Sequence, residues 1–258
     1  MKEFFGIGGY QREPEGFLSW QHLTFVTTLM VIMVALAWYL GRKNRPHTDP
    51  VKNKVLLWAG GLIVFLDLFE IFFVCIRDRD PWGWTHLLPL FLCSMQAVAI
   101  PMAALCKGRI REAALDFVFL FGILGAVSGT YGAGQNYAAY PVLSFNNVLS
   151  GITHTTAGFA SLYIAFSGMA SMKRKNIGLC FGVLLTFCVV AYGVNHLVDY
   201  NYMFLMRGDG TPYDILYNLV GGNPVLYPLG VVVLFLIYIV VFYHVYFAVT
   251  RKKVKEHA

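Results

Sequence analysis

Long apolar segments alternate with short polar breaks along the whole chain. A helix needs about 20 apolar residues, at 1.5 Å rise each, to cross a bilayer. Seven segments meet this requirement: Ser19 to Leu40, Val55 to Ile76, Leu87 to Cys106, Ala113 to Tyr131, Val148 to Met172, Ile177 to Val198 and Val225 to Val249. Runs of this length satisfy their backbone as helices, not as the alternating strands of a barrel. The pattern predicts an all-α transmembrane bundle of about seven helices.

Composition agrees with lipid as the main solvent of the chain. Hydrophobic residues make up 57% of 258 positions and charged residues 13%, which leaves too little polar surface for a water-soluble globule. We therefore expect a single transmembrane domain over residues 1–258, with a short outer segment at 1–18 and a basic tail at 250–258. The first residues have no small-residue cleavage site after a basic start, so we expect the first span to be retained.

The positions of the basic residues indicate the orientation. Cytoplasmic loops hold an excess of Lys and Arg, and 15 of the 20 such residues follow the first, third, fifth and seventh predicted spans. This places the amino terminus outside and the carboxyl terminus in the cytoplasm. The same distribution explains the net charge of +6 without nucleic acid as a partner. All five cysteines lie within spans or at their ends, which disfavours a disulfide framework.

Polar and ionisable residues gather in the outer half of the predicted bundle. Ionisable residues are unfavourable by about 2.5 to 3.5 kcal/mol at the bilayer centre, so each one within a span is a functional hypothesis by default. Asp67 and Glu70 lie three residues apart on one helix face, and Cys93 and Gln96 have the same spacing. Further members lie near the outer boundary: His22, His86, His154, His196 and Asp199. The sequence predicts a polar cavity in the outer leaflet.

A cysteine and a histidine on neighbouring helices can act as nucleophile and base. His154 would take the thiol proton of Cys93, and the thiolate would attack an ester to give an acyl-enzyme. Gln96 or Asn147 would donate a hydrogen bond to the oxyanion. This chemistry requires neither a metal nor a cofactor. Structural roles stay open: Cys93 as a small apolar residue and His154 as a hydrogen-bonded bridge between helices.

Asp67 and Glu70 allow two interpretations. They would orient the histidine or bind a lipid headgroup in a membrane acyltransferase or lipid esterase. Alternatively, they would relay protons with His196 in a proton-coupled small-molecule transporter. His196 and Asp199 are also open to a simpler role as a pair at the membrane interface.

A metal-dependent lipid hydrolase is a third hypothesis. His86, His196 and Asp199 are residue types that hold catalytic zinc together with a water molecule. No two of the intramembrane histidines have the helical i, i+4 spacing, which weakens this hypothesis. A retinal-type receptor is disfavoured, because the last predicted span contains no lysine for a Schiff base.

Several motifs resemble the YwaF-like bacterial branch of the transmembrane protein 164 family. They are LSWQHL around His22, HLLPLFLCS from His86 to Ser94, THTTAG around His154, NYMFLMRGDGTPYDIL from Asn201 to Leu216, and GGNPVLYPL before the last span. The resemblance implies a fold related to the androgen-induced-protein lipid hydrolases. It also implies a multi-pass protein of a bacterial plasma membrane.

The resemblance further implies transfer of a fatty acyl chain onto a lysophospholipid, with phospholipid or lysophospholipid as substrate. The positions that match the family's catalytic residues are Cys93 and His154. Relatives often have a histidine two residues before the cysteine, whereas this chain has Phe91. Either His86 or His154 must then serve as the base, or this branch has lost the activity.

Overall fold

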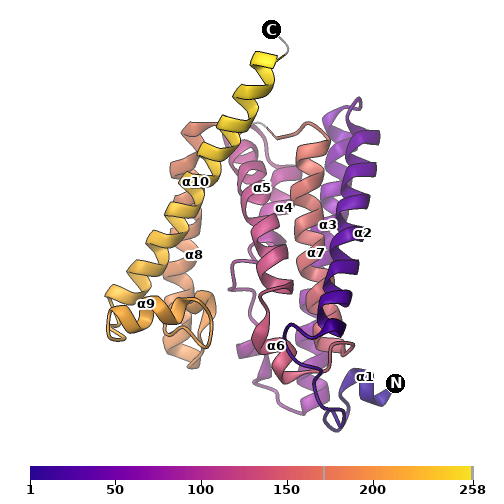
Figure 1. Cartoon of the computed structure of the whole chain (residues 1–258), viewed down its shortest axis with the longest axis vertical. Coiled ribbons are helices and arrows are strands. Elements are labelled where there is room, and N and C mark those ends of the chain that lie inside the picture. The colour runs from indigo at the N-terminus through magenta and orange to yellow at the C-terminus, as the bar shows by residue number, and fades with distance from the viewer. Residues whose placement is uncertain (171, 257–258) are drawn as a thin grey trace. The chain divides into compact units, whose positions relative to one another are not determined.

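A computed structural model describes residues 1–170 and 172–256, with side chains to residue 250. The side chains of the predicted basic tail after residue 250 lie outside this description. The chain forms two compact units, Met1–Ala170 and Ser171–Ala258, where the sequence predicts one bundle (Figure 1).

The first unit is a helical bundle. Its elements are α1 (Lys2–Phe5), α2 (Trp20–Asn44), α3 (Asp49–Asp78), η1 (Gly83–His86), α4 (Gln96–Leu105), α5 (Gly108–Thr130), α6 (Gly134–Ala139) and α7 (Phe145–Phe166). Helix α7 packs against α5, α2 and α3, and α4 packs against α3 and α5. Figure 1 shows α7 running beside α2 and α5. Helix α7 therefore contacts three of the other long helices of this unit.

The second unit is a helical pair that carries a folded connection. Its elements are η2 (Arg174–Asn176), α8 (Ile177–Val198), η3 (Tyr202–Phe204), α9 (Tyr213–Leu219) and α10 (Leu226–Glu256). Helix α10 packs against α8 and α9, and η3 packs against α8. The segment between α8 and α10 thus folds onto its own unit.

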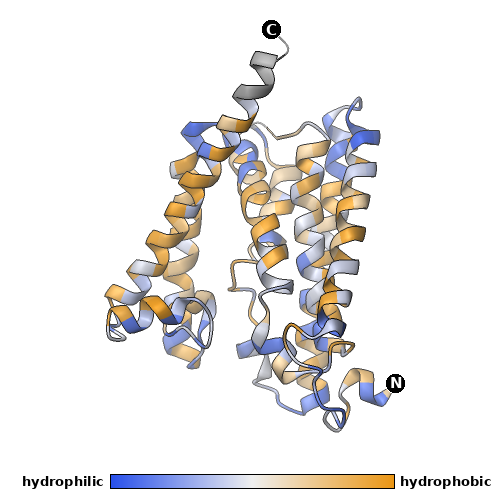
Figure 2. Ribbon diagram, in the orientation of Figure 1, coloured by the Kyte–Doolittle hydropathy of each residue, from blue (hydrophilic) through white to orange (hydrophobic). Residues whose placement is uncertain are grey.

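The described residues include five helices that are long and apolar enough to cross a membrane. They are Trp20–Asn44, Asp49–Asp78, Gly108–Ala139, Arg174–Val198 and Leu226–Thr250. Figure 2 shows apolar residues along these helices, with hydrophilic residues concentrated toward helix ends and loops. The prediction of an all-helical, multi-pass membrane protein is confirmed. The two other predicted spans correspond to α7, which has 22 residues but a more polar sequence, and to α4, which has ten.

The third predicted span, Leu87 to Cys106, is only partly helical. Regular helix begins at Gln96, and residues 87–95 form turns and bends. Pro89 has no N–H to donate and disfavours the helical conformation at Leu88. Cys93 therefore lies in a turn just before α4.

The contact between α5 and α7 is close because small residues meet there. A methyl group on Gly122 would lie 2.6 Å from the carbonyl oxygen of Ala157. Nearby, Ser161 Oγ donates to the carbonyl oxygen of Phe119 at 2.6 Å. Gly122 thus allows the backbones of α5 and α7 to approach closely.

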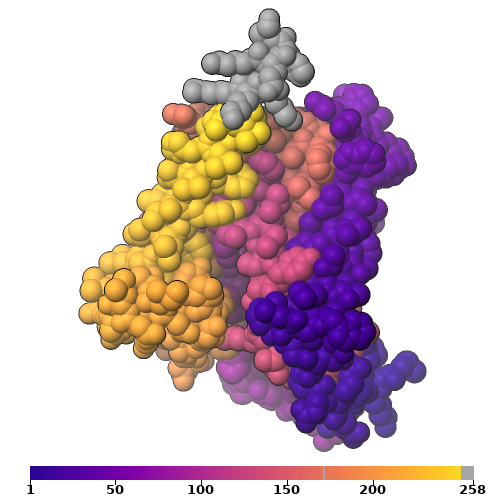
Figure 3. Space-filling model, viewed as in Figure 1, coloured from indigo at the N-terminus to yellow at the C-terminus, as the bar shows by residue number. Residues whose placement is uncertain are grey.

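The amino-terminal segment, residues 1–18, packs against one end of the first unit. Glu15 Oε2 accepts a hydrogen bond from the Val142 N–H at 2.7 Å, and Tyr10 Oη donates to Asn146 Oδ1 at 2.9 Å. Figure 3 shows this segment, in indigo, over the end of the unit that carries α6. The segment is thereby fixed to the loop before α7 and to the first turn of α7.

Candidate functional site

Helix α5 presents two glycines to the residues predicted to carry chemistry. A methyl group on Gly125 would lie 3.8 Å from Cβ of Cys93, and one on Gly129 would overlap the imidazole of His154. Residues four apart lie on one helix face, about 6 Å apart along the axis. Cys93 and His154 therefore pack against successive turns of the same face of α5.

Cys93 and His154 do not hydrogen-bond to each other. Cys93 Sγ lies 4.0 Å from Ser94 Oγ, a long contact to its neighbour in the chain. His154 Nδ1 is buried and makes no hydrogen bond within the described residues. The two predicted catalytic groups share a helix face, but the proton-transfer contact between them is not formed.

Gln96 lies next to Cys93, in the first turn of α4. Its backbone N–H donates to the carbonyl oxygen of Cys93 at 3.1 Å. The side chain is 0% exposed, and neither Nε2 nor Oε1 has a hydrogen-bond partner among the described residues. A buried polar group without a partner is unfavourable by about 1–3 kcal/mol. Such a group is expected where a ligand supplies the missing bonds.

Asp67 of α3 lies on the helix face that packs toward α4. Gly60 belongs to this face, and a methyl group on it would lie 2.8 Å from Cδ of Pro101 in α4. Asp67 continues this face seven residues later, whereas Glu70 lies on a neighbouring face, seven residues before Arg77. Asp67 Oδ2 is buried without a hydrogen-bond partner in the described chain, and this carboxyl is within electrostatic range of Cys93.

Asn147 cannot donate to an oxyanion in this conformation. Its Nδ2 group donates to the carbonyl oxygens of Tyr140 at 3.1 Å and Pro141 at 3.0 Å. Its Oδ1 is buried and has no partner within the described residues. Asn147 therefore holds the turn before α7 and offers a ligand only an acceptor. Of the two predicted oxyanion donors, Gln96 has its amide hydrogens free of protein partners.

His22 has both ring nitrogens occupied. Nδ1 accepts from the Leu18 N–H at 3.1 Å, and Nε2 lies 3.1 Å from the carbonyl oxygen of Thr130, to which it donates. The ring packs on Tyr137 with centroids 3.9 Å apart and is 0% exposed. His22 joins the start of α2 to the end of α5 and leaves no nitrogen for a substrate.

The residues of the metal hypothesis lie apart in the chain and in different environments. His86 is exposed at the end of η1 in the first unit. In the second unit, His196 is exposed, and its ring stands nearly perpendicular to that of Tyr192, with centroids 4.7 Å apart. Asp199 is exposed and ends α8 with a φ of 51°. Among the described residues there is no group of three or more His, Cys, Asp or Glu that could hold a metal ion.

Arg77 has a largely buried side chain. It lies in the last turn of α3, and its side chain is 7% exposed. It donates to both carboxylate oxygens of Asp78, at 2.7 and 2.9 Å, and to Asn146 Oδ1 at 2.8 Å. Its guanidinium is thus committed to protein partners and ties α3 to α7.

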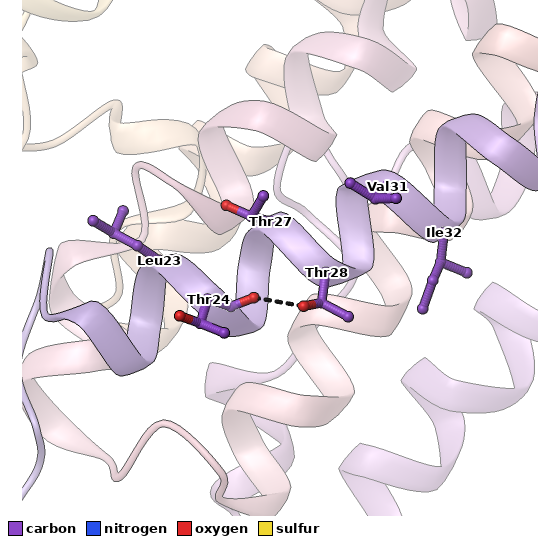
Figure 4. A pocket seen from close by; sticks show the side chains of 6 residues that line it. All are labelled: Leu23, Thr24, Thr27, Thr28, Val31 and Ile32. Carbon is purple, nitrogen blue, oxygen red and sulfur yellow. Dashed lines mark hydrogen bonds between the residues drawn. The ribbon is translucent and has the colours of Figure 1, made fainter.

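Two surface grooves along α2 lie apart from these residues. The first has a volume of about 500 Å³ and is lined by Leu23, Thr24, Thr27, Thr28, Val31 and Ile32. Figure 4 shows these side chains, with Thr28 Oγ1 donating to the Thr24 carbonyl oxygen at 2.8 Å. The second groove continues along α2 to Trp38 and includes Tyr131. Neither lining includes Cys93, Gln96 or His154.

Comparison with known proteins supplies the family. The sequence model of the TMEM164 family matches residues 17–246, which include every candidate residue described above. No curated protein and no solved structure matched the chain.

Proposed function

The chain belongs to the TMEM164 family, and on that premise we propose that it is a membrane lipid acyltransferase or lipid esterase with Cys93 as nucleophile. The observation that carries the proposal is the set of buried polar atoms without partners around Cys93: both amide atoms of Gln96, Nδ1 of His154 and Oδ2 of Asp67. The described chain leaves these atoms unpaired, and an ester substrate would pair with them.

The reaction begins with transfer of the Cys93 proton to Nδ1 of His154. This step requires a side-chain rotation that brings the two groups into contact, as is common when a substrate closes a site. The thiolate then attacks the ester carbonyl carbon, and Gln96 Nε2 donates to the developing oxyanion. The C–O bond breaks, the leaving alkoxide takes the proton from His154, and the acyl group stays on Cys93 as a thioester.

The thioester is resolved by one of two acceptors. The hydroxyl of a lysophospholipid attacks in a transferase, and water attacks in an esterase. In either case His154 takes the proton of the attacking hydroxyl and returns a proton to the Cys93 sulfur. Asp67 and Glu70 orient His154 or contact the lipid headgroup.

The proposal includes a membrane topology for the chain and a leaflet for the site. The excess of Lys and Arg in alternate loops supports a seven-span topology with the amino terminus outside and the carboxyl terminus in the cytoplasm. The site then faces the outer leaflet of a bacterial plasma membrane. The motifs around His22, His154 and Asn201 favour the YwaF-like branch of the family.

Intact-protein mass spectrometry tests the nucleophile. Wild type, Cys93→Ser and the control Cys75→Ser are incubated with mixed phospholipids and a lysophospholipid, with and without hydroxylamine. Cys75 is a free, partly buried cysteine of the same unit. We expect an added acyl mass on wild type and on Cys75→Ser that hydroxylamine removes, and no such mass on Cys93→Ser.

Lipid turnover is measured in the same samples, because fast deacylation would hide the adduct. Turnover by wild type that disappears in Cys93→Ser supports the mechanism without a visible adduct. Unchanged turnover by Cys93→Ser, or the absence of both signals in wild type, rejects it.

Proton-coupled transport is a second candidate, favoured by the two neighbouring carboxyls of α3. Glu70 is within electrostatic range of both Asp67 and Arg77, so protonation of one carboxyl affects the other. Proteoliposome uptake driven by a pH gradient, present in wild type and lost in Glu70→Gln, would favour transport. Retention of that uptake in Cys93→Ser would separate it from the enzyme.

A further inference from the structure

The segment between α8 and α10 in the second unit is held by its own hydrogen bonds. Asn195 bridges to Tyr202, accepting from its N–H at 2.7 Å and donating to its carbonyl oxygen at 3.0 Å. Asn201 Oδ1 accepts from the N–H of Met206 at 2.9 Å, and its Nδ2 donates to the carbonyl oxygen of Arg207 at 2.8 Å. These bonds give the segment a fixed shape that can position side chains for a ligand.

Two carboxylates of this segment differ in their pairing. Asp209 accepts from Arg207 Nε at 2.7 Å and from Asn201 Nδ2 at 2.6 Å, so its charge is compensated locally. Asp214 packs directly against Gly208, where a Cβ would overlap it. Its carboxylate makes no hydrogen bond or ion pair within the described residues. Asp214 therefore keeps an uncompensated negative charge.

Tyr227 supplies a second, independent observation at the same place. Its side chain is 1% exposed, and its hydroxyl has no hydrogen-bond partner in the described chain. The ring of Tyr217 stands nearly perpendicular to that of Tyr227, at 83° with centroids 5.1 Å apart. The Tyr227 hydroxyl is within electrostatic range of Asp214 and Tyr213. A buried hydroxyl without a partner among the described residues therefore belongs to a ring in contact with Tyr217 and lies within electrostatic range of the Asp214 carboxylate.

The charge of the segment agrees with a cationic ligand. Residues 199–224 contain three aspartates and one arginine, in a chain whose net charge is +6. A carboxylate attracts an ammonium group, tyrosine ring faces attract it through their negative quadrupole, and a tyrosine oxygen accepts from its N–H groups. Anions are disfavoured by the same arrangement.

We propose that Asp214, Tyr213, Tyr217 and Tyr227 form a binding site for an ammonium group, here called the ammonium site. The ligand is a small amine or the ammonium of a zwitterionic lipid headgroup, since both present the same charge. The site belongs to the second unit alone and does not depend on the chemistry proposed for Cys93.

Binding of defined probes to the full-length protein in detergent tests the site. Radiolabelled choline and ethanolamine probe small amines, and retention of phosphatidylcholine or phosphatidylethanolamine against phosphatidylglycerol in native mass spectrometry probes headgroups. We expect Asp214→Asn and Tyr217→Leu to weaken binding at least about tenfold, and Tyr227→Phe to weaken it a few-fold. Asp199→Asn is the matched control, because Asp199 is an exposed aspartate outside the site.

Saturable binding of the free amines assigns the site to small molecules, and selective retention of the zwitterionic lipids alone assigns it to headgroups. Either result supports the proposal. It is overturned if no probe is retained selectively, if Asp214→Asn binds as wild type, or if Asp199→Asn loses as much as Asp214→Asn. Tyr227→Phe removes only a hydroxyl without protein partners, so it keeps the test valid if another variant misfolds. Asp214→Asn is expected to keep the acyl-transfer rate of wild type, because the ammonium site lies in the second unit and the proposed catalytic residues lie in the first.

Discussion

The region around His22 and the region around His154 both place an imidazole against the last two turns of α5. His22 meets the carbonyl oxygen of Thr130, and His154 lies over Gly129, the preceding residue. In the first region both ring nitrogens are hydrogen-bonded to backbone groups. In the second, Nδ1 is buried without a partner among the described residues. Two histidines at the same end of one helix therefore differ in what they leave available for chemistry.

This difference separates a structural from a chemical role better than burial does. Both side chains are wholly or partly buried, and both belong to motifs of the family resemblance. A satisfied imidazole stabilises the fold, whereas an unsatisfied one destabilises it unless a ligand completes its bonds. Gln96 and Asp67 also have buried polar atoms without partners among the described residues, so the region around Cys93 has several unpaired atoms, not one.

The largest expected effect is on catalysis. His154→Asn is expected to lower the rate of acyl transfer by about 10²- to 10⁴-fold, because the general base is removed. The melting temperature should change little, since the Nδ1 of His154 has no protein partner to lose. The measurement is transfer of a labelled acyl chain to a lysophospholipid, with thermal melting in detergent. Full activity of His154→Asn would show that His154 is not the general base.

The next effect is on stability at His22. His22→Ala is expected to lower the free energy of unfolding by about 2–4 kcal/mol, because the Leu18 N–H and the Thr130 carbonyl lose their partners. Folded His22→Ala should keep the transfer rate of wild type. Thermal melting and activity of the folded fraction measure both quantities. Exposed His196 is the control, since His196→Ala should stay within about 0.5 kcal/mol. Equal destabilisation by the two variants would contradict a structural role for His22.

A smaller effect is expected from crowding the His154 ring. Gly129→Ala is expected to lower the free energy of unfolding by about 1–3 kcal/mol, because the new methyl overlaps the imidazole. Gly61→Ala in α3 is the control, since a methyl there meets nothing within 4 Å. It should be neutral or stabilising by up to about 1 kcal/mol. If Gly129→Ala melts like Gly61→Ala, the ring is not held against α5.

The smallest effect is expected from removing unpaired polar atoms. Gln96→Met has nearly the same shape and is expected to leave the free energy of unfolding unchanged or to raise it by up to about 1 kcal/mol. Asn44→Leu is the contrasting variant, because Asn44 Nδ2 donates to Tyr163 Oη at 3.1 Å and that bond is lost. Thermal melting of both variants in the same detergent decides the point. A clear loss of stability in Gln96→Met would mean that Gln96 is satisfied within the protein.

The sequence alone determined that most of the chain lies in lipid, that its fold is helical, and where most of the helices lie. Hydrophobic runs and the need to satisfy backbone hydrogen bonds in lipid are local properties, so they can be read residue by residue. The predicted span Ile177 to Val198 coincides with α8. The sequence also singled out Cys93, Gln96, Asp67 and His154 as polar residues within apolar surroundings.

Only the tertiary structure decided what each candidate touches. His22 finds its acceptor 108 residues away at Thr130, and Tyr10 finds its acceptor 136 residues away at Asn146. Such partners depend on how the helices pack, which no local pattern specifies. The same packing brought Gly125 and Gly129 against Cys93 and His154, whereas the local turn before α7 took up the Asn147 hydrogens. The need to satisfy backbone hydrogen bonds in lipid determines which segments are helices. Side-chain contacts between distant segments determine which polar atoms remain available for chemistry.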